Sequence, residues 1–311
     1  MTWTEAIDSQ ELLGLEQRSN LRSFALDPAW AEAAEASGFA TPHWLGVKDR
    51  GLLLAAALGL RRKRAGFSKV VCGTNGGVGI IAAESQAAIH LLGEVRRQWR
   101  PSILQVFARQ KVPQDGFRWE PTYTIHVSLE GSLDAVKSRL SKRARNSLNR
   151  AIRSGVKAES ASSSGVEAAL DMLERTSRVR GFPIPVRSYL AALHDVFGRS
   201  GLSVLSLAKR NGEILSVVHV LGARGIASWW KGGSSAEGYR SNASLVAHWK
   251  AMQVAKERGF EVYDLGGTHP TNPAYSSIHK FKSSFGGELI TGSLGRWSTS
   301  AARAASWLSS L

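Results

Sequence analysis

A helix, a stop signal and a strand follow one another twice along this chain of 311 residues. Residues 83–107 read as an amphipathic helix, a stop at Pro101 and a strand. Residues 243–265 repeat this order, with Gly259 at the position where glycine favours the end of a helix. Because elements in this order pack in layers, the repeat predicts an α/β (α+β) fold with a mixed central sheet in each half, flanked by helices. The strand that holds Tyr263 is expected in the centre of the second sheet.

A run of basic residues lies between the two halves. From residue 137 to residue 157 the chain has eight lysines and arginines and no acidic residue. On a helix, one side would carry cations together with Asn146, and the opposite side would be apolar. We call the cations the basic ridge: Arg139, Lys142, Arg143, Arg150 and Arg153. A merely solvated helix face usually mixes both signs of charge, so the ridge predicts an anionic ligand. Residues 160–165 then read as a flexible connector.

The most informative motif lies near the C-terminus. Residues 263–268 (YDLGGT) read as the end of a strand followed by two glycines, and residues 278–288 (IHKFKSSFGGE) place two lysines beside two phenylalanines. Glycines after a strand allow a tight turn or the close approach of a ligand. Lysines beside aromatic rings suit a phosphate-bearing ligand. A tight turn leading into a packed helix with solvated lysines is the alternative.

These motifs resemble those of the FemAB-like aminoacyltransferases, which build peptidoglycan interpeptide bridges, and of their acyl-CoA-using relatives in the GNAT superfamily. The C-terminal motif resembles the family's closing motif, and residues 140–156 (LSKRARNSLNRAIRSGV) resemble its basic helix. Residues 229–259, from WWKGG to KERG, resemble its strand, acceptor loop and long helix. The resemblance implies two tandem GNAT-like units, the first degenerate. The expected boundaries are a first unit at 1–130, the basic helix and connector at 131–165, and a catalytic unit at 166–311.

The resemblance also implies a site where two central strands part, at residues 227–230 and 262–264. Lys282 matches the family's "FK" step together with Phe281, and is expected to hold a phosphate or stabilise the developing charge. Tyr263 would donate its hydroxyl to the oxyanion, and Asp264 would orient or deprotonate the amine. The remaining candidates for binding of donor or substrate are Phe281, Trp229, Trp230, Asn242, Gly266, Gly267, Arg143 and Arg150. Each has a structural alternative, since Tyr263 suits a strand, Asp264 a turn and the tryptophans a core.

The expected activity is transfer of an acyl or aminoacyl group, without a covalent intermediate. No cofactor is expected to stay bound, because the co-substrate would be acyl-CoA or aminoacyl-tRNA. The acceptor would be an amine of a cell-wall, polysaccharide or lipid precursor that carries phosphate. The R/Q-x-x-G-x-G/A loop of ordinary acetyl-CoA enzymes is not evident, which weighs against acetyl-CoA without excluding it. The alternatives are a basic nucleic-acid-binding protein that uses the ridge and a catalytically inactive scaffold.

Composition limits the remaining possibilities. The chain has 40 basic and 25 acidic residues, for a net charge of +15, which favours anionic ligands such as tRNA, a nucleotide, a phospholipid-linked precursor or a membrane surface. The single cysteine, Cys72, excludes an internal disulfide, and the histidine spacing predicts no metal site. The apolar run at residues 51–60 is about half of a membrane span and reads as a buried strand followed by a solvated basic turn. The expected location is the cytoplasm, with peripheral contact to the inner face of the membrane left open.

Overall fold

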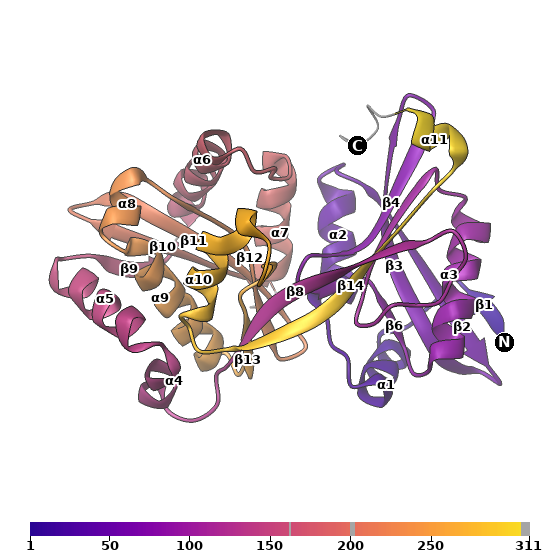
Figure 1. The fold of residues 1–311 in the computed structure, drawn as a ribbon, viewed down its shortest axis with the longest axis horizontal. Helices are drawn as coiled ribbons and strands as arrows, with labels where there is room; N and C mark the ends of the chain where they lie inside the picture. Colours follow the sequence, from indigo (N-terminus) through magenta and orange to yellow (C-terminus); the bar gives the residue numbers. More distant parts are fainter. Residues whose placement is uncertain (162, 200–202, 306–311) are drawn as a thin grey trace. The chain divides into compact units, whose positions relative to one another are not determined.

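The computed structural model describes residues 1–161, 163–199 and 203–305. The chain divides into two compact units (Figure 1). Unit 1 comprises Met1–Tyr123 and Thr291–Leu311, and unit 2 comprises Thr124–Ile290. The chain passes from one unit to the other within strand β8 (Arg118–Ser128) and again within strand β14 (Glu288–Ser298). Among the described residues, no helix combines the length and the apolar character needed to cross a bilayer.

Unit 1 is a sheet with helices. Its strand order is β1-β2-β3-β4-β7-β14, and all neighbours are antiparallel except β4 and β7, which are parallel. The short strands β5 and β6 and helix α3 (Ser85–Trp99) connect β4 to β7, and Leu91 of α3 belongs to the same core cluster as Ala55 and Ala57 of β3. The other elements of this unit are β1 (Thr2–Thr4), α1 (Ser9–Ser19), η1 (Phe24–Leu26), α2 (Pro28–Ala36), β2 (Thr41–Asp49), β3 (Leu52–Arg64), β4 (Phe67–Thr74), β5 (Gly77–Val78), β6 (Ile80–Ala82), β7 (Ile103–Ala108) and α11 (Ser300–Ala304).

Unit 2 repeats this plan. Its strand order is β9-β10-β11-β12-β13-β8, and only β12 and β13 are parallel. Helix α9 (Ala243–Glu257) connects them, and α4, α5 and α9 share one core cluster while α6 and α7 form another (Figure 1). The other elements are α4 (Leu133–Arg139), α5 (Lys142–Arg153), β9 (Lys157–Ser160), α6 (Ser163–Arg180), α7 (Arg187–Arg199), β10 (Ser203–Arg210), β11 (Glu213–Ala223), β12 (Ile226–Ser234), α8 (Ala236–Arg240), β13 (Val262–Asp264), η2 (Pro273–Tyr275) and α10 (Ser276–Ser283).

The predicted α/β fold with mixed sheets and flanking helices is confirmed. Both helix–stop–strand segments form as expected, and β13, which holds Tyr263, is paired on both sides. Two local interpretations were wrong. Arg61–Arg64 continue strand β3, so the predicted basic turn is part of a strand. The predicted connector is also helical from Ser163 onward, because α6 begins there; residue 162 lies outside the described part of the chain.

Candidate active site

The candidate site begins where the two parallel strands of unit 2 part. Ala227 pairs with Tyr263 and Ser228 pairs with Asp264, and the pairing ends there. Strand β13 stops at Asp264, whereas β12 continues to Ser234. The carboxyl end of a parallel pair leaves backbone groups open to a ligand, and binding sites in α/β sheets lie at such ends. The structure therefore brings the two predicted segments together, with the opening at the expected place.

Asp264 is fully buried at this opening and is held by several donors. Its Oδ1 accepts hydrogen bonds from the hydroxyl of Thr124 and from the backbone N–H of Gly266, the latter at 2.8 Å. Its Oδ2 lies 3.5 Å from the hydroxyl of Ser228 and 3.9 Å from Nε2 of His126. A buried carboxylate with this many donors has a fixed orientation. His126, with 27% of its side chain exposed, is the accessible neighbour of Asp264.

Tyr263 points to the opposite face of the sheet, as alternation along a strand requires. Its hydroxyl is 2.9 Å from Nδ1 of His248 on α9, and both side chains are buried. Burial, and then the charge of Lys282, lowers the pKa of His248 to about 3, so this imidazole is neutral at physiological pH. Burial, and then the charge of Asp264, raises the pKa of the Tyr263 hydroxyl. To donate to an oxyanion, as the sequence suggested, the Tyr263 hydroxyl would have to give up its hydrogen bond with His248.

Lys282, on helix α10, has only 5% of its surface exposed, although a lysine side chain in water carries a charge at neutral pH. Its Nζ donates to the backbone carbonyl of Gly267 at 2.6 Å and lies 4.7 Å from the centroid of the Trp229 ring. Burial lowers its pKa to about 7; the charge of Lys231 also lowers it, and Asp264 opposes the shift. Gly266 has φ +67°, and an added Cβ would lie 3.0 Å from the carbonyl oxygen of Trp229, so the turn beside the lysine requires glycine.

Aromatic rings surround the lysine on the α9 side. Trp229 and His248 meet edge to face with ring centroids 4.4 Å apart, and His248 also contacts Phe285 at 5.3 Å. Phe281 lies 5.3 Å from Phe285 and 6.5 Å from Trp229, again edge to face. The cation lies over Trp229, and Phe281 and Phe285 join Trp229 and His248 in one aromatic wall. Such a wall excludes water and strengthens the field of a nearby charge.

The two neighbouring tryptophans, Trp229 and Trp230, pack against different core clusters. Trp229 packs against the cluster that contains α9, and Trp230 packs against the cluster that contains α6. A β-bulge in β12 explains the difference. Val220 of β11 pairs with Trp229 and His219 pairs with Lys231, so Trp230 is the extra residue between them. The Nζ of Lys231 lies 4.9 Å from the Trp230 ring centroid, and burial lowers the pKa of Lys231.

The basic ridge is not a single helix. Helix α4 ends at Arg139, and Ser141 begins α5 by accepting a hydrogen bond from the N–H of Ala144. Arg139 instead donates to the backbone carbonyls of Ser128 and Glu130. Its predicted place in the ridge was therefore wrong. The predicted apolar side of the basic segment is confirmed, because its members are all buried: Val136, Leu140, Ala144, Leu148 and Ala151.

A pocket of about 600 Å³ joins the remaining ridge to the start of α9. Arg143, Arg150 and Asn242, three of the residues predicted from the sequence, line it together. The other lining residues are Lys142, Asn146 and Ser147, so none carries a negative charge. Asn242 precedes the first turn of α9 with φ +57° and makes no side-chain cap. The positive end of the α9 dipole and three cations therefore converge on one pocket, which suits a phosphate group.

Sequence reasoning missed His248 and the groups around Asp264. His248 lies three residues after Leu245 and four before Met252, so it belongs to the buried face of α9. A titratable residue on an otherwise apolar helix face was the available signal. Thr124 and Ser228 had no comparable signal, because each is an ordinary strand residue whose role depends on pairing across the sheet.

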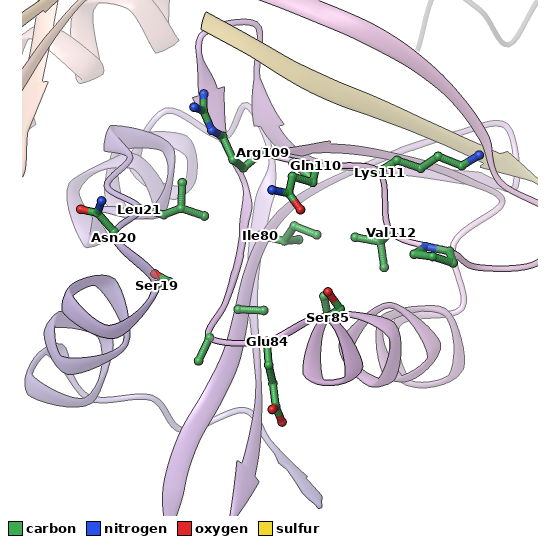
Figure 2. Close-up of a pocket in the computed structure, with 15 residues that line it drawn as sticks. Ser19, Asn20, Leu21, Ile80, Glu84, Ser85, Arg109, Gln110, Lys111 and Val112 are labelled. Carbon is green, nitrogen blue, oxygen red and sulfur yellow. The ribbon is translucent and has the colours of Figure 1, made fainter.

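Unit 1 has a cavity of its own, of about 420 Å³ (Figure 2). It lies beyond the end of β7 and beside the first turn of α3, and both signs of charge line it. Figure 2 shows the charged ends of Arg109, Lys111 and Glu84 pointing away from one another. This cavity offers no convergent charge comparable to that of the pocket between α5 and α9.

A protein-family model matches part of unit 2. Residues 138–279 match the family model described as an acetyltransferase (GNAT) domain. This range contains α5, β12, α9, β13 and part of α10, whereas Thr124, His126 and Lys282 lie outside it. Residues 138–279 are therefore similar to a GNAT domain, in agreement with the resemblance seen in the sequence, and the match covers less than half of the chain. Among curated proteins it has no match.

Solved structures extend the likeness to both units. FemX aligns with a TM-score of 0.72 and 15% identity, covering 94% of this chain and 97% of FemX. The C-terminal domain of a putative lysylphosphatidylglycerol synthetase from Agrobacterium fabrum aligns with a TM-score of 0.57 and 14% identity, covering 96% and 95%. A tandem GNAT protein from the clavulanic acid biosynthesis pathway aligns with a TM-score of 0.56 and 10% identity, covering 95% and 97%. At these low identities, the alignments show a shared fold over nearly the whole chain.

Proposed function

We propose that this protein is an N-acyltransferase that moves an acyl or aminoacyl group from acyl-CoA or aminoacyl-tRNA to an amine of a cell-wall, polysaccharide or lipid precursor. The observation that carries the proposal is the placement of Lys282 and Asp264 at the point where β12 and β13 part. The GNAT family model supports acyl transfer. The likeness in fold to FemX and to the putative lysylphosphatidylglycerol synthetase supports an aminoacyl donor as one of the two choices.

In the proposed reaction, the acceptor nitrogen attacks the donor carbonyl carbon, and a C–N bond forms. The carbonyl oxygen becomes an oxyanion, and the C–S bond to CoA or the C–O bond to the tRNA ribose then breaks. The amine loses a proton and the leaving group gains one. Lys282 in its ammonium form would stabilise the oxyanion or a phosphate, because its buried charge is not screened by water. An anion bound there would raise the lysine pKa from about 7 and keep the ammonium form.

Asp264 would orient the amine or accept its proton. The donors that fix this carboxylate leave it next to His126, which is partly exposed and 3.9 Å away. A proton taken from the amine would therefore have a path to solvent through the imidazole. Tyr263 and His248 would act by holding the aromatic wall behind Lys282 rather than by touching the substrate.

The pocket between α5 and α9 would bind the phosphates of the donor or of a phosphorylated acceptor. Arg143, Arg150 and the N-terminal end of α9 meet there without a neighbouring carboxylate in the lining. Arginine matches phosphate in a bidentate manner, and helix N-termini stabilise anions. This assignment gives the predicted ridge residues a binding role and leaves Arg139 outside the site.

The proposal is tested by incubating the purified protein with radiolabelled acetyl-CoA, longer acyl-CoAs and a mixture of aminoacyl-tRNAs, each with and without a panel of amine acceptors. We expect one donor class to lose its acyl group, faster when the correct acceptor is present. Release of free CoA or deacylated tRNA identifies the donor. If no donor is consumed above the rate without protein, with any acceptor, the proposed activity is wrong.

A further inference from the structure

A second lysine lies beside the opening between β12 and β13. Lys231 follows Trp230 on β12, beyond Ser228, which is the last residue of this strand that pairs with β13. Its side chain is half-buried, and its Nζ lies 4.9 Å from the centroid of the Trp230 ring. Lys231 takes no part in the reaction proposed above, although it lies at the edge of the site.

The ammonium group of Lys231 lacks a hydrogen-bond acceptor. A lysine has three N–H donors, and within the described ranges the Lys231 side chain makes no hydrogen bond or ion pair, its contact being the face of the Trp230 ring. Lys282, by comparison, donates to the carbonyl of Gly267. Removing a charge from water without such a partner is unfavourable, and burial accordingly lowers the pKa of Lys231. An anion in the site would supply the missing acceptor.

Lys231 and Lys282 lie close enough for the charge of one to act on the other. Each ammonium group lies over one of two consecutive tryptophans, Lys282 over Trp229 and Lys231 over Trp230. Burial lowers the pKa of Lys282 to about 7, Asp264 opposes the shift, and the charge of Lys231 adds to it. Like charges at one opening repel each other, and a negatively charged ligand offsets that repulsion. The two lysines therefore favour a ligand with an anionic group.

Lys231 and the pocket between α5 and α9 belong to opposite faces of the unit 2 sheet. Val217 and Val218 of β11 belong to the α6 cluster and the α9 cluster, respectively, because successive strand residues point to opposite faces. Trp230, over which Lys231 lies, packs against the α6 cluster. A transfer reaction brings two substrates together, and cations on two faces provide a separate place for each.

We propose that Lys231 binds a negatively charged group of the amine-bearing acceptor, a carboxylate or a phosphate, and thereby selects anionic acceptors. The assignment rests on the proposed function, with the donor phosphates in the pocket between α5 and α9 and the charged group of the acceptor at Lys231. A lysine matches either anion as a compact point charge with several donors. Lys231 is in this view a residue that determines specificity, whereas Lys282 acts at the transferred group.

The first test measures anion binding without turnover. Trace acetic anhydride acetylates neutral amines, and mass spectrometry then gives the labelling of each lysine at pH 7.5. Inorganic phosphate and acetate are the probes, and sodium chloride at equal ionic strength is the reference. A bound anion favours the charged form, so labelling of Lys231 should fall at least about threefold relative to that of the exposed Lys280. Protection by phosphate alone indicates a phosphorylated acceptor, and protection by acetate alone indicates a carboxylate. No protection by either probe would overturn the inference.

The second test compares the KM values of Lys231→Met and the wild type, with the donor and acceptor that the transfer assay identifies. The KM for the acceptor should rise at least about tenfold, and the KM for the donor should stay within about twofold. Lys250→Met is the matched control, because Lys250 is also half-buried, on α9 of the same unit. This control should change neither value.

An unchanged KM for the acceptor of Lys231→Met, a rise only for the donor, or an acceptor without negative charge would contradict the role of Lys231. The labelling result does not depend on transfer. Failure of either probe to protect Lys231, in a protein that consumes its donor, would therefore overturn this inference and leave the proposed function standing. Protection of Lys231 in a protein that consumes no donor would contradict the proposed function, and with it the assignment of the anion to an acceptor.

Discussion

At the scale of single residues, Lys282 is the most unusual feature of the molecule. Burying a lysine is unfavourable unless its charge is compensated or lost. The Nζ of Lys282 donates to the carbonyl oxygen of Gly267 and lies over the face of Trp229. The carboxylate of Asp264 favours the charged form, but it offsets the effect of burial only in part. A pKa of about 7 is the consequence. This lysine changes between charged and neutral forms under physiological conditions, which an exposed lysine does not.

The pKa of Lys282 predicts how stability depends on pH. Below pH 7 the ammonium form is present in both the folded and the unfolded chain, and the folded state bears the full cost of burying it. Between about pH 7 and the ordinary value of 10.5, the unfolded chain binds a proton that the folded chain lacks, so stability rises with pH, by about 1.4 kcal/mol per unit at most. Lys282→Met should therefore be more stable than the wild type at pH 6, by an amount that narrows towards pH 9.5.

Urea denaturation of both proteins at pH 6, 8 and 9.5 measures this difference. Lys280→Met is the control, because Lys280 is exposed two residues away on the same helix. Its stability difference from the wild type should not change with pH. A constant difference for Lys282→Met across the same range would mean that the lysine has an ordinary pKa in the folded protein.

At the scale of elements, the break between α4 and α5 decides which cations of the ridge form a site. Ser141 starts a new helix, and the new helix axis turns Lys142, Arg143 and Arg150 towards Asn242 at the start of α9. Arg153 lies on the same helix but does not line the pocket. The pocket is therefore a joint product of two helices, and its position depends on the packing of their apolar sides in one core cluster.

Charge reversal tests this pocket. Arg143→Glu together with Arg150→Glu should raise the KM for the phosphate-bearing substrate by at least about tenfold, since a hydrogen bond to a charged group contributes about 1.5–3 kcal/mol. The effect should shrink as salt rises, because the Debye length is about 8 Å at 0.15 M ionic strength. Steady-state kinetics at several salt concentrations measure both effects. Arg153→Glu, on the same helix, should change KM little, and an equal effect of this control would argue for a general charge effect without a defined pocket.

The sequence was sufficient for elements whose signals are local. The helices and strands of both helix–stop–strand segments form where apolar spacing and stop residues predicted them. The ridge was misjudged as one helix because its basic and apolar spacing continues across Ser141. The contact between Tyr263 and His248, and that between Thr124 and Asp264, join residues from separate elements, so no local spacing could reveal them.

At the scale of the whole molecule, part of the positive charge gathers in the pocket between α5 and α9. The chain has a net charge of +15, and three of its cations line this pocket, whose lining includes no carboxylate. Acidic residues elsewhere form ion pairs, as Glu167 and Asp171 do with Arg187. Composition alone predicted an anionic ligand, and the fold brings these three cations of α5 together beside the start of α9.

The single cysteine reports on the integrity of unit 1. Cys72 is fully buried in β4, and burial raises the pKa of its thiol. A thiol must ionise to react, so the folded protein should resist a thiol-reactive dye, and denatured protein should react at once with one equivalent. Absorbance during labelling in buffer and in denaturant measures this difference. Fast labelling in buffer would show that unit 1 opens readily or that β4 is not packed as described.

We propose that Lys282 acts at the transferred group. The most direct test compares the turnover of Lys282→Ala, Lys280→Ala and the wild type with the identified donor and acceptor. Loss of one buried, positioned charge typically lowers turnover by about 10²–10³. We expect that loss for Lys282→Ala, with a melting temperature near that of the wild type at neutral pH, and wild-type turnover for Lys280→Ala. If Lys282→Ala turns over normally, the assignment of the site is wrong, even though the fold stands.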